Sequence, residues 1–154
     1  MSDSDNDRRA LALEGVELCR RGRWGEGLQR LGKIAESDGS SEDLPSEYFA
    51  YLGYGIARFE DRLREGLRLC ERAVKREFYR VDNYSMLART ALLANNRRKA
   101  VVAVERGLAI DRQDQALLKL KRDMGVRRSP VLPFLSRESA LNRLLGRLRH
   151  ALLH

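Results

Sequence analysis

The chain has 154 residues, of which 43% are hydrophobic, 34% are charged and 6% are aromatic, and its formal net charge is +8. This length fits one domain with a modest core, and the lack of any apolar run of about 18 residues excludes a membrane-spanning helix. Residues 1–7 are polar and acidic, so we expect no secretory signal and a cytoplasmic location.

The cysteine content and the charge distribution indicate more about the class of protein to which the chain belongs. The chain contains only Cys19 and Cys70, too few for a disulfide framework, and unpaired cysteine is commonly buried in a core. Residues 125–154 contain six arginines and one acidic residue, Glu138. The basic character therefore belongs mainly to this C-terminal tail.

The residue pattern is helical almost throughout, without the alternating Val/Ile/Thr-rich runs that predict strands. The three prolines fall in stretches that are typical of connectors. We therefore predict an all-α fold, preceded by a disordered acidic N-terminus over residues 1–7.

A unit of two helices recurs three times along the chain. Glycine, and less readily Asn or Asp, adopts the left-handed conformation that ends a helix, and these residues occur at Gly22, Asp61 and Asn95. Five positions further on, a small residue would let two helix backbones approach closely: Gly27, Gly66 and Ala100. Each unit is thus predicted to be a helical hairpin.

This spacing resembles the tetratricopeptide repeat, a helical hairpin of about 34 residues. The repeats would cover residues 8–41, 47–80 and 81–114, and Tyr54 would occupy the position of the family's small residue in the second unit. The resemblance implies a right-handed α-solenoid over residues 8–124, closed by a capping helix over 114–124 that Asp114 can cap.

The first helix of each unit lines a concave groove in proteins of this family. The helix predicted over residues 47–60 has no charge from 48 to 57, so it is either core on every side or leaves a face for a partner. By the resemblance, the groove would be lined by Arg20, Tyr48, Tyr51, Gly55, Arg58, Phe59, Ser85, Arg89 and Leu92. Such a groove would suit an apolar helix or an extended peptide that carries some acids.

The tail, residues 125–154, is predicted to contain a basic amphipathic helix after an extended Pro-containing stretch. Its apolar residues could fill the groove, pair with a partner or with a second copy of the chain, or lie on an anionic surface. These residues are Phe134, Leu141, Leu144, Leu145 and Leu148.

The sequence contains no catalytic constellation. Both histidines, His150 and His154, lie among the last five residues, and neither a metal-ligand spacing nor a phosphate-binding loop is present. We therefore expect no enzyme, no cofactor and no metal site. The expected function is that of a scaffold, an adaptor or a small chaperone that binds a protein or peptide, similar in size and plan to small bacterial-type secretion chaperones. The alternative is a protein that associates with nucleic acid or with an anionic membrane through its basic tail.

Overall fold

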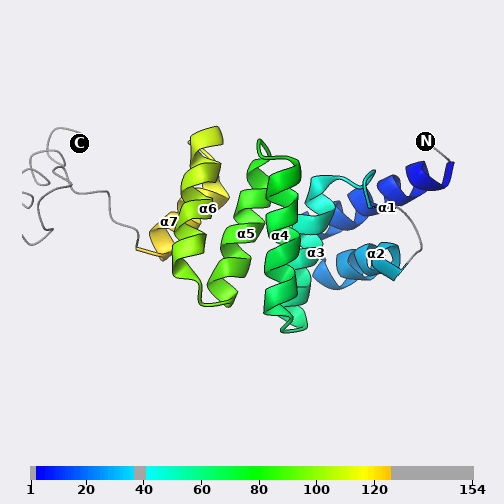
Figure 1. Ribbon diagram of the computed structural model, residues 1–154, viewed down its shortest axis with the longest axis horizontal. Helices are drawn as coiled ribbons and strands as arrows, with labels where there is room; N and C mark the ends of the chain where they lie inside the picture. The colour runs from blue at the N-terminus through cyan, green and yellow to red at the C-terminus, as the bar shows by residue number, and fades with distance from the viewer. Residues whose placement is uncertain (1–2, 37–40, 126–154) are drawn as a thin grey trace, which may run out of the picture. The chain divides into compact units, whose positions relative to one another are not determined.

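A computed structural model describes residues 3–36 and 41–125, and every regular element in these ranges is an α-helix. The prediction of an all-α fold is confirmed for this part of the chain. Seven helices follow one another in chain order (Figure 1): α1 (Asp3–Arg20), α2 (Trp24–Glu36), α3 (Ser46–Phe59), α4 (Leu63–Arg76), α5 (Val81–Leu93), α6 (Arg97–Ile110) and α7 (Gln115–Asp123).

Helix α1 begins earlier than the sequence predicted. Residues 3–7, expected to be disordered, form its first turns. Aspartates at positions 3, 5 and 7 favour a helix N-terminus, because the unpaired backbone N–H groups there carry partial positive charge. A polar composition alone therefore did not distinguish a helix start from a disordered segment.

Three tight turns reverse the chain between α1 and α2, α3 and α4, and α5 and α6, so that each pair packs antiparallel (Figure 1). Their central residues have positive φ: +82° at Gly22, +58° at Asp61 and +55° at Asn95. These are the positions at which the sequence predicted a helix end.

Pairs of glycines bring the two helices of a hairpin together. A Cβ added to Gly27 would lie 2.8 Å from the carbonyl oxygen of Gly15, and one added to Gly53 would lie 2.7 Å from the carbonyl oxygen of Gly66. The small residue opposite Gly66 is thus Gly53, not Tyr54. A helix turns about 100° per residue. The residues of α3 that point towards each neighbouring helix are therefore different from those that the repeat spacing predicted.

The first helices of the hairpins form a continuous row, in which α1 contacts α3, α3 contacts α5 and α5 contacts α7. Each second helix packs against its own partner and against the first helix that follows it, so α2 contacts α3, α4 contacts α5 and α6 contacts α7. Among the described helices, the backbones of α2, α4 and α6 do not pack against one another, and α4 and α6 are joined through their side chains by the ion pair Glu71–Lys99. As a result, α3 is enclosed by four helices, and residues 46–57 are all buried.

Helix α7 covers the end of the third hairpin. The Asp114 side chain accepts a hydrogen bond from the backbone N–H of Leu117 at 2.8 Å and so caps the helix. Leu117 is fully buried, and it packs against α6 at Gly107, where a Cβ would overlap it.

Candidate functional site

One side of α3, which was predicted to line the groove, is covered by α2. The hydroxyl of Tyr48 donates to the carbonyl oxygen of Leu31 at 3.4 Å, and a Cβ at Gly55 would overlap the side chain of Leu28. Tyr48 and Gly55 therefore form part of the packing between hairpins. The assignment of these two residues to an open groove is corrected by the rotation of α3 described above.

An aromatic cluster joins the start of α2 to α3. The Trp24 ring lies with its centroid 5.9 Å from that of Tyr51, 5.1 Å from that of Tyr54 and 6.2 Å from that of Phe59. Phe59 is 56% exposed, and the guanidinium of Arg58 lies 5.9 Å from its ring centroid. Tyr51 is buried in the cluster, whereas Phe59 and Arg58 lie at its exposed edge.

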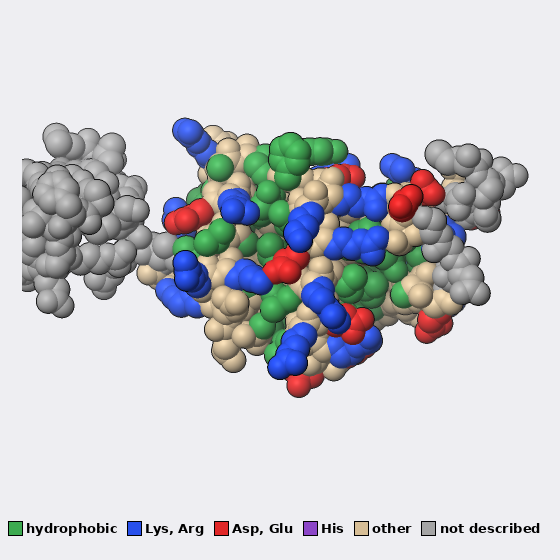
Figure 2. All heavy atoms as spheres, viewed as in Figure 1, with side chains coloured by type: hydrophobic (Ala, Val, Ile, Leu, Met, Phe, Trp, Pro, Cys, Tyr) green, Lys and Arg blue, Asp and Glu red, His purple; other side chains and the backbone are tan. Residues whose placement is uncertain are grey.

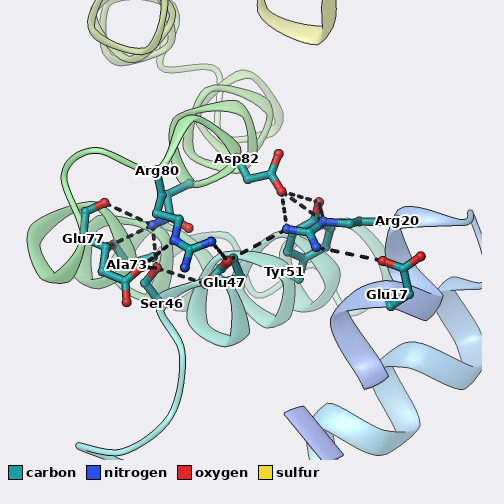
Figure 3. A network of polar contacts seen from close by, with 10 residues as sticks. Glu17, Arg20, Ser46, Glu47, Tyr51, Ala73, Glu77, Arg80 and Asp82 are labelled. Atoms are coloured by element: carbon teal, nitrogen blue, oxygen red, sulfur yellow. Dashed lines mark hydrogen bonds and ion pairs between the residues drawn. The ribbon is translucent and has the colours of Figure 1, made fainter. Parts of the chain in front are cut away.

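Arg20 is engaged in a polar network that spans α1, α3 and the start of α5 (Figure 3). Its Nε donates to Asp82 at 3.0 Å and to the Tyr51 hydroxyl at 3.3 Å, and its Nη2 lies 2.5 Å from the Asp82 carboxylate. In the same network, the buried carboxylate of Glu47 pairs with Arg80 at 2.6 Å. Arg20 thus links three helices of the row, and its guanidinium is already paired with acids of this chain.

The network also affects proton binding. Burial raises the pKa of Tyr51 to about 12, and the negative charge of Asp82 adds to this effect. For Arg20, burial acts to lower the pKa, but the hydrogen bonds to Asp82 and Tyr51 outweigh it and raise the pKa. The tyrosine therefore stays neutral and the arginine stays charged at physiological pH.

A cavity of about 280 Å³ opens between α3, α5 and α7; we call it the α3–α5–α7 cavity. Two of the residues predicted to line the groove, Arg89 and Leu92, lie in its wall. Leu93, which the same repeat spacing places in the groove, also lies in the wall, whereas the remaining lining was not predicted: Tyr54, Ala116, Lys119, Leu120 and Asp123. The wall is thus mainly apolar and carries charged groups from α5 and α7.

Three polar atoms of α5 are buried without a hydrogen-bond partner among the described residues. They are Nε of Arg89, Oγ of Ser85 and Oδ1 of Asn83. Arg89 and Ser85 are four positions apart, so they lie on the same side of α5. Buried polar groups are nearly always paired, and an orphaned charged donor is costly, so this pair marks a place where an acceptor is missing.

The two thiols do not provide a nucleophile. Cys19 and Cys70 are free and buried, as the sequence predicted. Burial raises the pKa of Cys19 to about 11 and that of Cys70 to about 12, so both remain protonated thiols. In residues 3–36 and 41–125, no three His, Cys, Asp or Glu side chains gather where they could share a metal ion.

The signal for the missed lining residues was present in the sequence. Leu120 and Lys119 belong to the helix that was predicted only as a cap, and Tyr54 was assigned to the hairpin contact that Gly53 makes.

The tail residues that were predicted to bind a partner lie outside the described residues: Phe134, Leu141, Leu144, Leu145 and Leu148. None of the helices in the described part has the length and hydropathy needed to cross a bilayer.

Compared with known proteins, the chain matches no protein-family model and no curated protein sequence.

Proposed function

We propose that the chain is a protein-interaction module of the tetratricopeptide type: a right-handed α-solenoid of three helical hairpins that binds a peptide segment of another protein. Its role is that of a scaffold, an adaptor or a small chaperone. The proposal of this architecture is supported by the left-handed turn residues at matching places in three hairpins and by the contacts between successive first helices. The terminal cap that a stack of repeats requires has its counterpart in α7.

The orphaned Nε of Arg89 at the α3–α5–α7 cavity is the observation that carries the binding proposal. A carboxylate from a bound peptide would pair with the guanidinium of Arg89, which makes no ion pair with the described residues, and the charge-assisted contact would favour binding at this cavity. Apolar peptide side chains would cover Leu92 and Leu120 in the same cavity. The proposed ligand is therefore a short segment with one acid next to apolar residues.

The position of Arg20 supports placing the site at the α5–α7 end of the row. Arg20 already pairs with Asp82 of this chain, so it offers a ligand no unpaired guanidinium. Arg89, in contrast, makes no ion pair with the described residues, and its Nε has no acceptor.

Selection of binding peptides from a random library tests the proposal. With the full chain as bait, we expect enriched peptides of about 12 residues to contain Asp or Glu beside apolar residues. Arg89→Met keeps the alkyl stem but removes the guanidinium, and it should weaken the selected peptides by about 1–3 kcal/mol. Arg112→Met, in the exposed turn before α7, is the matched control and should leave the affinity unchanged.

Two results would contradict the proposal. One is a selection that enriches no common peptide pattern. The other is a set of peptides that bind wild type and Arg89→Met equally well while both proteins melt at the same temperature.

A further inference from the structure

A second, larger groove lies on the opposite helices of the second and third hairpins. It has a volume of about 540 Å³ and runs between α4 and α6, whose backbones do not pack against each other; we call it the α4–α6 groove. Its floor is apolar and is provided by Tyr84 and Leu87 of α5. No residue of this groove belongs to the α3–α5–α7 cavity.

The helices that border the groove carry a high density of positive charge. Helix α4 has five basic residues against two acids, and α6 has four basic residues against one acid. Figure 2 shows Lys and Arg side chains spread over the face formed by these helices, with hydrophobic side chains between them. The basic character that the sequence assigned mainly to the tail is therefore also present on this surface.

Several arginines of the first two hairpins have an acid of their own, as in the pairs Arg23–Glu26 and Arg62–Glu65. In the groove, the acid Glu71 is already paired with Lys99, which joins α4 to α6. The groove residues that make no ion pair with the described residues are Lys75, Arg98 and Arg106. These three cations thus form a positively charged rim that no acidic side chain of the described residues neutralises.

The rim and the floor together define the chemistry of an occupant. Arg98, Val102 and Arg106 follow one another at intervals of four residues, so they form a stripe along α6 in which an apolar side chain separates two cations. The two arginine Cα atoms are about 12 Å apart, since a helix rises 1.5 Å per residue. Val102 is 41% exposed, and it faces the groove.

We propose that the α4–α6 groove binds an acidic amphipathic helix of a partner protein. Apolar residues of that helix pack on Val102 and on the floor, and acidic residues about two turns apart pair with Arg98 and Arg106. The charge pattern favours this occupant over the chain's own tail, because residues 125–154 contain six arginines and one acid and would be repelled. It also favours a peptide over nucleic acid, because phosphates would use the cations but would leave Val102 and the apolar floor uncovered.

The probe for the test is a synthetic, fluorescein-labelled helical peptide of roughly 18 residues, with leucines along one face and glutamates flanking them. Binding to the full chain is measured by fluorescence anisotropy. Two control peptides of the same length replace either the glutamates with lysine or the leucines with serine. We expect only the Glu/Leu peptide to bind.

Matched variants locate the site. Arg98→Glu/Arg106→Glu should weaken binding by about tenfold or more, whereas Lys33→Glu/Arg112→Glu, which alters the net charge equally at other exposed positions, should change it less than about twofold. Val102→Ser should weaken binding by about threefold, because it removes exposed apolar surface without opening the core. Arg89→Met reports separately on the α3–α5–α7 cavity: binding that is lost in this variant but kept in Arg98→Glu/Arg106→Glu belongs to that cavity and not to the α4–α6 groove.

Several results would overturn the proposal. The Glu/Leu peptide could fail to bind, or the two double variants could weaken it equally, which would mean that only net charge matters. Displacement of the peptide by duplex DNA, with a steep salt dependence and no effect of Val102→Ser, would identify a nucleic-acid surface instead. A dimer of the free chain that dissociates on Arg98→Glu would identify a second copy as the occupant.

Discussion

Helices α3 and α4 have the same length, 14 residues each, but they differ in how they are surrounded. Helix α3 is enclosed by four helices, and twelve of its residues are buried. Among the described helices, the backbone of α4 packs only against α3 and α5, and α4 buries Gly66, Cys70 and Ala73 while its other residues, seven of them charged, reach towards solvent. The comparison teaches that enclosure by neighbouring helices selects an uncharged helix that contributes buried surface to the core, whereas a half-covered helix keeps a charged, exposed face.

The largest expected effect is at the contact between these two helices. In Gly66→Ala, the new Cβ would overlap the carbonyl oxygen of Gly53 and force α3 and α4 apart, so we expect destabilisation by about 3 kcal/mol. Gly32→Ala in α2 is the matched control, because a Cβ there would meet no atom within 4 Å. That change should stabilise the protein by about 0.5–1 kcal/mol, because glycine is a poor residue inside a helix.

Both variants are compared with wild type by urea unfolding followed by circular dichroism. Equal free energies of unfolding for Gly66→Ala and wild type would show that the helices can separate without cost, and the comparison of α3 with α4 would fail.

A smaller effect is expected from the buried side of α4 at high pH. The Sγ of Cys70 lies 3.4 Å from the carbonyl oxygen of Ala50, and burial raises the pKa of this thiol to about 12. Because the unfolded thiol has a pKa of about 8.5, its contribution to stability is fully present below that pH and is lost as pH rises towards 12. Between pH 8 and pH 10, Cys70 should account for a loss of about 2 kcal/mol.

The contribution of Cys70 is isolated by measuring the free energy of unfolding of wild type and Cys70→Ala at both pH values. The decrease should be smaller in the variant, although Cys19 leaves part of it in place, since burial also raises its pKa. An identical decrease in the two proteins would show that Cys70 ionises as readily in the folded state as in the unfolded one.

The smallest effect concerns the exposed side of α4. The guanidinium of Arg72 lies 4.3 Å from the ring centroid of Phe49 in α3, so Arg72→Ala should cost about 0.5–1 kcal/mol. Arg68→Ala, one turn earlier on the same helix, is the control and should change stability by less than about 0.5 kcal/mol. The two thermal midpoints should therefore differ, and equal midpoints would mean that the contact of Arg72 with the ring adds nothing to stability.

The candidate site could be predicted only in part. Arg89 and Leu92 were assigned from the repeat spacing, and both line the α3–α5–α7 cavity. Tyr48 and Gly55 were not placed correctly, because one additional residue in α3 moves Gly53 into the contact with Gly66. The sequence pattern does not reveal such a shift. Gly53 and Tyr54 are adjacent, so both match the repeat spacing to within one residue.

Short-range residue preferences were sufficient for the helical class and for the places where the chain reverses. The charge-free stretch 48–57 also indicated the most buried helix, because a helix without charges has no side that favours water. The pairing of Arg20 with Asp82, which are 62 positions apart, the orphaned Nε of Arg89 and the groove between α4 and α6 were decided by the tertiary structure. These features depend on how each helix is rotated against its neighbours, and that rotation is set by packing between helices rather than by the residues of any one of them.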